Sequence, residues 1–269
     1  MTPLGISEPI LRFGVFAAVF ALCALAEALR PRRQRKYVRS HRWFTNAGMV
    51  VAATLLVRAA LFVAPLLAGS AAAALTISQG WGLFQFLDWP VWLEIILAIV
   101  ALDFVIWAQH VATHHVPVLW RLHRVHHSDQ DLDVSSALRF HPLEILFSAA
   151  VKMLAILVLG PAVLAVILFE IILNASAMFN HSNIDLPRPL DRLLRAFIVT
   201  PDMHRVHHSS IRTEHDRNFG FCLSIWDRLA GVYLSQPKAG HEAMTIGLKE
   251  WQVEETQSLG WSLRFPFKG

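Results

Sequence analysis

The chain has 269 residues, of which 55% are hydrophobic and 16% are charged, and its mean hydropathy is +0.45. Soluble domains carry about 25% charged residues, so the composition excludes an ordinary soluble enzyme and indicates an integral membrane protein of one domain. The formal net charge is +4, but seven of the 24 lysines and arginines lie between Arg30 and Arg42, directly after an apolar run. We therefore expect a basic juxtamembrane loop and no nucleic-acid partner. Cys23 and Cys222 are too few cysteines for a disulfide framework.

The first apolar segment, Phe13–Leu29, is interrupted by Glu27 and bracketed by Arg12 and Arg30. Its seventeen residues are near the lower limit for a membrane-spanning helix. A cleaved signal peptide is the alternative, but Arg30-Pro-Arg-Arg is a poor cleavage context. The segment therefore predicts a retained span, and the positive-inside rule places the following basic run in the cytoplasm and the N-terminus outside.

The second apolar stretch runs from Ala47 to about Leu75 and contains Arg58. It predicts one span followed by a continuation of small residues. Arg58 should face the protein interior or snorkel, and Glu27 or Asp103 are its candidate partners. The segment that follows has no Lys or Arg and carries Trp81, Phe84, Phe86 and Trp89, as expected for an exterior interface.

A third span, Val91–Ala108, should continue as a helix beyond the membrane and carry the first histidines to the cytoplasmic surface. Leu143–Phe179 is then apolar for 37 residues with a break at Gly160-Pro161, which predicts a helical hairpin that returns to the same side. Lys152 and Glu170 lie inside the hairpin and therefore need inward or paired positions.

These segments predict an all-α integral membrane protein with about three transmembrane helices, a membrane hairpin and a cytoplasmic helical cap. The expected divisions of this single domain are the N-terminal transmembrane helices (1–108), the first two histidine clusters (109–142), the hairpin (143–180), the third cluster with its cap (181–235) and a C-terminal tail (236–269).

Three histidine clusters stand out in this chain. They are His110 and His114; His123, His126 and His127; and His204, His207 and His208. Residues three and four apart on a helix share one face, so each cluster points its imidazoles the same way. A single histidine is usually an ordinary core or surface residue, but His-Arg-Val-His-His occurs twice. Neutral imidazole binds zinc, copper, iron and nickel, and eight imidazoles exceed the needs of one ion. The pattern predicts a dinuclear metal centre.

Three further features leave alternatives open. The acidic run at Asp129, Asp131 and Asp133 is expected to form a solvated loop or a helix cap, with carboxylate ligation as the less favoured role. His141 is either a helix-boundary residue or part of the site. The amphipathic segment 190–198 either lies on the inner membrane surface or packs on the domain.

The residue types narrow the chemistry. The clusters contain no Glu-x-x-His pair of the ferritin-like diiron type and no His-Glu-x-x-His zinc-peptidase signature. A mononuclear site with two histidines and one carboxylate would leave most of the histidines unused. A histidine-rich diiron centre at the membrane surface, suited to oxygen activation on a lipid, is what remains.

The sequence from about Asp103 to Tyr233 resembles the fatty acid hydroxylase/sterol desaturase superfamily of membrane diiron enzymes. Its pattern is most similar to the bacterial sterol desaturase-like proteins and to alkylglycerol monooxygenase. The resemblance is carried by His110-x-x-x-His114, Leu119-Trp120-Arg-Leu-His123-Arg-Val-His126-His127-Ser128, His141-Pro142, Asn180-His181, Thr200-Pro201-Asp-Met-His204-Arg-Val-His207-His208, Asn218-Phe-Gly220 and Ile225-Trp226-Asp227.

The resemblance implies two iron ions, with O2 as co-substrate. It assigns His110, His114, His123, His126, His127, His204, His207 and His208 as metal ligands, with His181 as an additional ligand. It leaves His215 as a surface residue. Because no haem or flavin motif occurs in the chain, electrons should come from a separate protein of the cytochrome b5 or ferredoxin type. The basic faces around Arg188, Arg192, Arg195 and Arg205 are candidate docking sites.

The expected activity is hydroxylation of a C–H bond in a fatty acid, sterol or ether lipid at the cytoplasmic face of a bacterial inner membrane, or of the endoplasmic reticulum in a eukaryote. Desaturation by the same centre begins with the same hydrogen abstraction and is the alternative. A zinc-binding membrane protein without redox activity and a non-catalytic scaffold are the other hypotheses.

Overall fold

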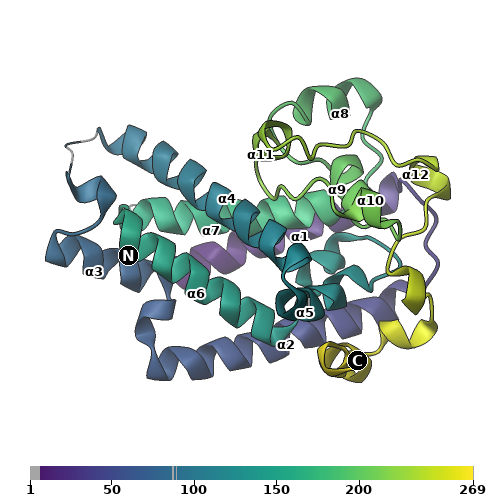
Figure 1. The fold of residues 1–269 in the computed structure, drawn as a ribbon, viewed down its shortest axis with the longest axis horizontal. Helices are drawn as coiled ribbons and strands as arrows, with labels where there is room; N and C mark the ends of the chain where they lie inside the picture. Colours follow the sequence, from purple (N-terminus) through teal and green to yellow (C-terminus); the bar gives the residue numbers. More distant parts are fainter. Residues whose placement is uncertain (1–6, 87, 89, 269) are drawn as a thin grey trace.

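A computed structural model of the chain describes residues 7–86, 88 and 90–268. In these ranges the regular structure is helical and no β-strand occurs, which confirms the all-α prediction. Five helices are long and apolar enough to cross a membrane: α1 (Glu8–Leu29), α2 (Arg39–Val63), α4 (Val91–His115), α6 (Pro142–Leu159) and α7 (Val163–His181). Figure 1 shows these helices running along the long axis of the molecule, with most of the short helices gathered at one end and the short helix α3 at the other.

The gathered short helices form a cap at one end of the bundle. Its elements are α5 (Pro117–His127), η3 (Val134–Leu138), α8 (Arg188–Leu194), α9 (Pro201–His207), α10 (Arg212–His215), α11 (Ile225–Leu229), α12 (Gly240–Ala243), η4 (Lys249–Trp251), η5 (Glu254–Gln257), α13 (Leu259–Arg264) and η6 (Phe265–Phe267).

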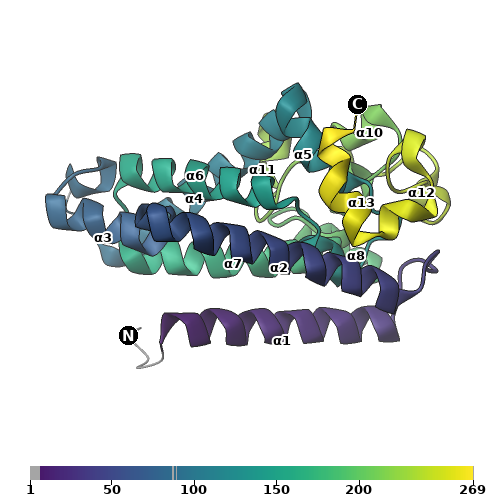
Figure 2. The same cartoon turned by 90° about the horizontal axis from the view of Figure 1, so that it is seen from below.

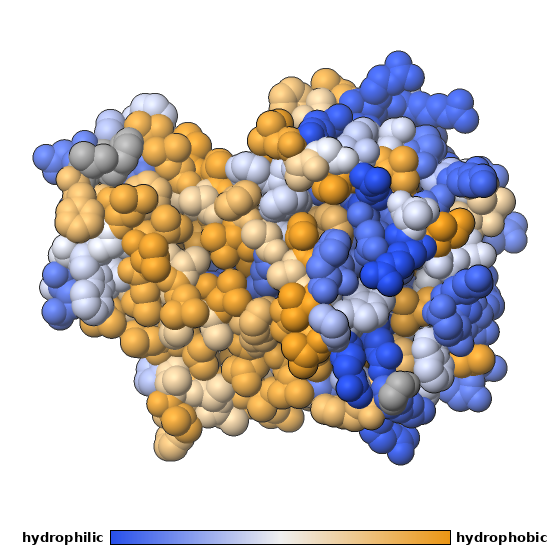
Figure 3. Space-filling model, viewed as in Figure 1, coloured by the Kyte–Doolittle hydropathy of each residue, from blue (hydrophilic) through white to orange (hydrophobic). Residues whose placement is uncertain are grey.

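The long helices are apolar both inside and outside. Inside the bundle, Leu102 of α4, Ile156 of α6 and Phe169 of α7 form one buried cluster. Outside, large side chains such as Phe62 and Val158 are 91% and 70% exposed. Figure 3 shows apolar residues covering the long-helix end and hydrophilic residues gathered on the cap. A surface of this kind is stable in lipid, so the arrangement is that of an integral membrane protein.

The second apolar stretch is divided into three elements. α2 ends at Val63, η1 (Pro65–Leu67) follows, and α3 (Gly69–Gln79) turns back to pack against α6 and α7. Proline disfavours the helical conformation of the residue before it, which explains the break. At about 1.5 Å per residue, the eleven residues of α3 cover about 16 Å and cannot span a membrane. The predicted continuation of small residues is thus a separate helix.

The predicted hairpin is present, and its turn depends on two glycines. Gly160 ends α6 with a φ of +63°, and Gly82 has a φ of +104°. A Cβ atom on Gly160 would lie 2.6 Å from the carbonyl oxygen of Trp81 and 2.9 Å from the Cα of Gly82. No side chain fits in this contact, which fixes the 81–86 segment, including η2 (Leu83–Phe86), against the hairpin turn. Trp81 and Phe86 are exposed, as expected for an interfacial segment, Phe84 is buried, and Trp89 lies outside the described residues.

The basic loop after α1 binds to the cap. Arg32 pairs with Asp202 at 3.3 Å, and the backbone N–H of Lys36 donates to the carboxylate of Asp131 at 2.8 Å. The loop therefore lies at the same end of the molecule as the histidine clusters. α1, which precedes the loop, runs along the edge of the bundle and packs on α7 (Figure 2).

The suggested partners of Arg58 are wrong. Arg58 is exposed on α2, whereas the carboxylate of Glu27 pairs with Arg39 and that of Asp103 accepts hydrogen bonds from a loop of the cap. An exposed arginine in a membrane-type helix can extend its charged end toward the interface.

The acidic run after α5 is buried, so the prediction that it forms a solvated loop is wrong. The alternative prediction of a helix cap holds for Asp133. Arg42 of α2 is fully buried and pairs with Asp129 at 2.7 Å and with Asp133. Asp133 also accepts from the backbone N–H of Ser135 and caps η3. This ion-pair cluster joins α2 to the segment that leads from the second histidine cluster to α6.

The predicted C-terminal tail is a folded part of the cap over residues 236–268. Phe265 and Trp261 pack against Met49 of α2 and Val125 of α5. Arg139 is fully buried and donates to the carbonyl oxygen of Val125 at 3.1 Å and to the hydroxyl of Ser262 at 3.0 Å. These contacts hold the outer side of α5, the helix that carries the second histidine cluster.

The amphipathic segment forms the short helix α8 and the turn after it. Leu193 and Phe197 are 61% and 66% exposed, and Leu190 is also exposed. These apolar side chains do not pack on the domain, so the interpretation in which this face covers the domain is wrong for them.

Replacing Arg42 by methionine should destabilise the protein strongly, because Asp129 and Asp133 would be left as uncompensated buried charges. Breaking a buried ion pair by removing one partner costs about 3–5 kcal/mol. The measurement is the thermal unfolding midpoint of the detergent-purified protein. Arg30→Met is the matched control, because its pair with Asp185 is exposed and should contribute less than about 1 kcal/mol. Equal midpoints for the two variants would contradict the structural role of the buried cluster.

Candidate metal centre

The structure brings together the nine histidines that the sequence singled out. α4 carries two of them, α5 three, the end of α7 one, and α9 with the residue after it three. They form one group of five, namely His110, His114, His123, His127 and His207, and one of four, namely His126, His181, His204 and His208. Within each group one nitrogen of every ring lies within 4.8 Å of the others, and all nine residues are buried.

Hydrogen bonds at the outer nitrogens fix the orientation of most rings. His110 Nδ1 lies 2.6 Å from the carbonyl oxygen of Phe219, and His207 Nδ1 lies 2.8 Å from that of Arg217. A carbonyl oxygen only accepts, so these Nδ1 atoms carry the proton and their Nε2 atoms present lone pairs. His181 Nδ1 binds the carbonyl oxygen of Ala177 in the same way. Outer partners of this kind are typical of metal-ligating histidines.

Two carboxylates do the same for two further rings, and the sequence analysis missed both. Glu144 Oε1 lies 2.6 Å from His123 Nδ1, and Asp216 Oδ1 lies 3.3 Å from His114 Nδ1. Glu144 is the first acidic residue of the long apolar run that forms α6 and α7. An acid at the start of a membrane-type helix was the sequence feature that could have indicated its contact with a histidine.

The inner nitrogens leave lone pairs facing one another. His110 Nε2 and His123 Nε2 are 3.1 Å apart, although both rings carry their proton on Nδ1. His181 Nε2 lies 3.0 Å from the Nε2 atoms of both His126 and His204. Two nitrogens that are each about 2.1 Å from one metal ion at a right angle are about 3.0 Å apart. The residues therefore fit a bound metal in both groups.

Several buried nitrogens have no hydrogen-bond partner in the described part of the chain. They are His114 Nε2, His127 Nε2, His207 Nε2, His126 Nδ1, His204 Nδ1 and both ring nitrogens of His208. An unsatisfied buried polar atom costs about 1–3 kcal/mol, and a cation at the centre of each group would satisfy the inner ones.

The environment keeps these imidazoles neutral. Burial, reinforced by the neighbouring imidazoles, holds the pKa values of the following histidines well below the ordinary value of 6.5: His126, His127, His204, His207 and His208. A neutral ring is the form that binds a metal ion, so the site is prepared for a metal at neutral pH.

The late Trp226-Asp227 motif holds the loop that orients His110. Asp227 accepts from the backbone N–H groups of Phe219 and Gly220 at 2.8 and 2.9 Å and from the indole of Trp107 at 2.9 Å. Burial raises the pKa of Asp227 to about 6.

A second carboxylate makes the matching contact from α4. Asp103 accepts from the indole of Trp226 at 2.9 Å and from the backbone N–H of Leu223 at 3.2 Å. α4 and α11 thus each supply one tryptophan and one aspartate, and the indole of each helix donates to the aspartate of the other. These paired contacts join α11 to α4 across the loop.

Five of the fourteen histidines lie outside the two groups, and three of these five are close to the groups in the sequence or in space. His141 begins α6, where its Nδ1 accepts from the backbone N–H of Leu143, so it is a helix-boundary residue. His115 follows His114 directly on α4 but is exposed. The surface position expected for His215 is wrong: its side chain is only 12% exposed and stacks on Trp120, with ring centroids 5.4 Å apart. It forms a small third set with His114 and Asp216.

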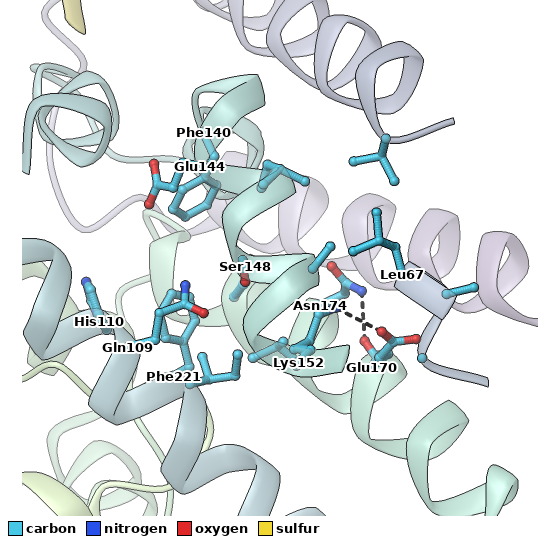
Figure 4. A pocket seen from close by; sticks show the side chains of 18 of the residues that line it. Leu67, Gln109, His110, Phe140, Glu144, Ser148, Lys152, Glu170, Asn174 and Phe221 are labelled. Carbon is cyan, nitrogen blue, oxygen red and sulfur yellow. Dashed lines mark hydrogen bonds and ion pairs between the residues drawn. The ribbon is translucent and has the colours of Figure 1, made fainter. Parts of the chain in front are cut away.

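A cavity of about 480 Å³ reaches the five-histidine group from the long-helix end of the molecule. His110 and His123 line its inner end, together with the apolar side chains of Ile106, Phe140 and Phe221. Figure 4 shows His110 and Gln109 at one end of this cavity, and Lys152, Glu170 and Asn174 at the other.

A family profile described as fatty acid hydroxylase matches residues 95–232, about half of the chain. The chain belongs to this family. It is 29% identical over 230 residues to the ornithine lipid hydroxylase OlsE of Rhizobium tropici, covering 83% of this chain and 67% of that protein. It is 31% identical over 156 residues to the alkylglycerol monooxygenase of Homo sapiens, covering 56% of this chain and 32% of that protein.

The alkylglycerol monooxygenase of Danio rerio gives 31% identity over 186 residues, with 65% of this chain and 39% of that protein covered. The chain therefore spans about two thirds of the bacterial relative and 32% and 39% of the two animal ones. No solved structure matches this chain. The hydroxylase-family segment contains all nine clustered histidines, which confirms the superfamily recognised from their spacing.

Replacing His207 or His127 by alanine should lower bound iron and abolish turnover, because each removes one nitrogen from the five-histidine group. Iron in the purified protein is measured by elemental analysis. His115→Ala is the control on α4, and His215→Ala should also leave iron content nearly unchanged, because His215 belongs to neither of the two groups. Full iron content in His207→Ala would contradict its assignment as a ligand.

Acid should destabilise the metal-free protein. Below about pH 6.5 the unfolded chain protonates histidines that the folded cluster keeps neutral. The unfolded state then binds more protons than the folded state, so the free energy of unfolding decreases as the pH is lowered. We expect the thermal unfolding midpoint of the metal-free protein to drop by several degrees between about pH 7 and about pH 5, and metal loading to offset the drop. A midpoint that stays constant over this range would contradict the buried, neutral state of the cluster.

Proposed function

We propose that this protein is an O2-dependent hydroxylase that uses two iron ions, held by the nine clustered histidines, to oxidise a C–H bond of a membrane lipid. The observation that carries the proposal is the convergence of imidazole lone pairs at one end of a cavity that lies among membrane-type helices and is apolar beside the histidines. Family membership supports lipid hydroxylation, because relatives are named as a lipid hydroxylase and a monooxygenase of alkylglycerols.

The two irons would supply the activation of O2, and imidazole ligands suit iron. The five-histidine group would hold one ion and the four-histidine group the other. The chain itself orients these ligands: Glu144 fixes the ring of His123, and the backbone carbonyl of Phe219 fixes that of His110. These contacts keep the lone pairs directed inward whether or not a lipid is bound.

The cavity wall would exclude water and position the lipid. Ile106, Phe140 and Phe221 line it beside the histidines, so a hydrocarbon segment can lie against them without loss of hydrogen bonds. Exclusion of water protects a reactive oxidising site from side reactions. Such a wall would select the position of hydroxylation because it holds one particular carbon atom of the lipid near the metals.

The histidine cap would lie on the cytoplasmic side of the membrane. Its end of the molecule carries the basic loop 30–42, and cytoplasmic loops of membrane proteins are enriched in lysine and arginine. The exposed apolar residues Leu193 and Phe197 would rest in the interfacial layer of the same leaflet. The topology of this proposal has three spans followed by the hairpin, in a bacterial inner membrane or an endoplasmic reticulum membrane.

Electrons would come from a separate protein of the cytochrome b5 or ferredoxin type. The docking role suggested for Arg195 and Arg205 is wrong because both are buried. A second cavity, of about 780 Å³, reaches His114 from the cap, with Trp120 and Arg124 in its wall. The Trp120 ring lies 5.1 Å from that of His114 by their centroids. This side of the cap is therefore the better site for reduction of the metals.

Desaturation is the second candidate, because the same centre and cavity would serve it. The names of the relatives favour hydroxylation. A non-redox zinc protein is the remaining alternative, since imidazole also binds zinc.

The proposal is tested with protein purified from iron-supplemented cells and supplied with a lipid extract, a reductase and a one-electron carrier. We expect about two irons per chain and a product that carries one atom from 18O2, detected by mass spectrometry, because a monooxygenase inserts one oxygen atom into the substrate. The His207→Ala variant is the inactive control.

Loss of two hydrogens without incorporation of labelled oxygen would instead identify a desaturase. Protein that binds zinc and takes up no iron on reconstitution would contradict the oxygenase proposal.

A further inference from the structure

The cavity beside the histidines ends in four charged side chains. Lys152 Nζ lies 2.8 Å from one carboxylate oxygen of Glu170, and Arg12 Nη2 lies 2.8 Å from the other. Arg12 also pairs with Glu8 at 2.8 Å. All four residues line the same cavity as His110 and His123, and two acids with two bases give the group no net charge.

The charged end lies at a defined distance from the histidines. Glu144, Ser148 and Lys152 follow one another at intervals of four residues on α6, so they share one face of the helix and all line the cavity. Eight residues of helix advance about 12 Å. Because Glu144 contacts His123, Lys152 lies roughly that far from the metal centre along the cavity, on the side away from the cap (Figure 4).

Lys152 keeps donors free for a ligand. An ammonium group has three N–H donors, and among the described residues Glu170 is its one hydrogen-bond partner. Both oxygens of Glu170 are already engaged, one by Lys152 and one by Arg12. The glutamate therefore orients the lysine without competing for its remaining donors, and those donors belong to a residue of the cavity wall.

Such a group is out of place in a cavity that serves hydrocarbon alone. An ionisable side chain inside a membrane domain is costly and usually marks a pathway or a ligand contact. A purely structural ion pair between α6 and α7 would need only one lysine and one glutamate. Here the pair is extended by Arg12 to α1, which lies at the edge of the bundle.

We propose that Lys152 donates a hydrogen bond to an acceptor oxygen of the lipid substrate, and that Glu170 and Arg12 hold it in place for this role. The substrate class is then a lipid with an ester, amide or carboxylate oxygen about 12 Å from the carbon that is hydroxylated, rather than a plain hydrocarbon or a sterol ring system. Lys152 sets both the class of lipid and the position of attack. The hydroxylation step itself rests on the proposed function.

The first test measures lipid binding without turnover. Metal-free and iron-loaded protein in phosphatidylcholine nanodiscs is equilibrated with equal amounts of deuterated methyl palmitate and deuterated hexadecane, and the lipid retained after washing is quantified by mass spectrometry. We expect the wild type to retain the ester in preference to the hydrocarbon. Lys152→Met should lower ester retention about tenfold or more, because a hydrogen bond from a charged donor is lost. Lys152→Arg should keep most of the preference.

Arg58→Met is the matched control, because it removes an exposed cation of α2 that does not line the cavity. Thermal unfolding and gel filtration establish that each variant is folded. If Lys152→Met aggregates, the double variant Lys152→Met/Glu170→Met removes both charges, leaves Arg12 with Glu8, and serves the same measurement. Equal ester retention by a folded lysine variant and the wild type would overturn the inference.

The second test uses the active enzyme and the position of the new hydroxyl group. We expect Lys152→Met to scatter the hydroxyl over several carbons and to raise KM more than it lowers kcat, because the reacting centre is unchanged. Unchanged position and retention in an active variant would refute the role of Lys152 and leave the hydroxylase function intact. Lysine-dependent retention with no labelled product from the wild type would support the binding site and refute the function.

Discussion

The structure depends on one constraint: nine imidazoles must stay neutral and directed inward in a space that excludes water. The Nε2 atoms of His110 and His123 are 3.1 Å apart, and that of His181 lies 3.0 Å from two others, so their lone pairs face one another. Without a cation between them this arrangement is repulsive, and water cannot relieve it because the rings are buried. The surrounding protein must therefore supply rigid support, and most of the polar contacts in the cap do so.

That support comes from paired contacts between elements far apart in the sequence. Asp227 of α11 binds the start of the 219–223 loop and Asp103 of α4 binds its end, and the loop orients His110 in turn. The buried Arg42 ties the segment after the second cluster to α2. Three of the nine histidines lie at the ends of the long helices α4 and α7, and the other six lie on or directly after the short helices α5 and α9. Helices fix the positions of such side chains more firmly than loops would.

Helical periodicity and composition were enough to predict the three spans, the hairpin with its break at Gly160 and the grouping of the eight histidines of the three clusters, because these depend on local spacing and on hydropathy. The ninth histidine, His181, was assigned by the resemblance to the family. The buried partners were not predictable in the same way. Glu144 and Asp216 contact their histidines across 21 and 102 residues, and no local pattern encodes such a contact. The predictions of a solvated loop at Asp129 and of a surface position for His215 were wrong for the same reason. Polar residues suggest contact with solvent, but tertiary packing buries Asp129 and stacks His215 on Trp120.

The packing of α13 against α2 and α5 has a consequence for biogenesis. α13 follows every histidine-bearing helix along the chain, so during synthesis α5 has no support on its outer side until all five long helices have left the ribosome. The long helices would then be synthesised before α13 packs on α5, and under the proposed function metal binding would be completed only after the C-terminal segment has folded. Under the proposed function, the metal that is incorporated would then depend on the conditions during this last folding step as well as on the histidines.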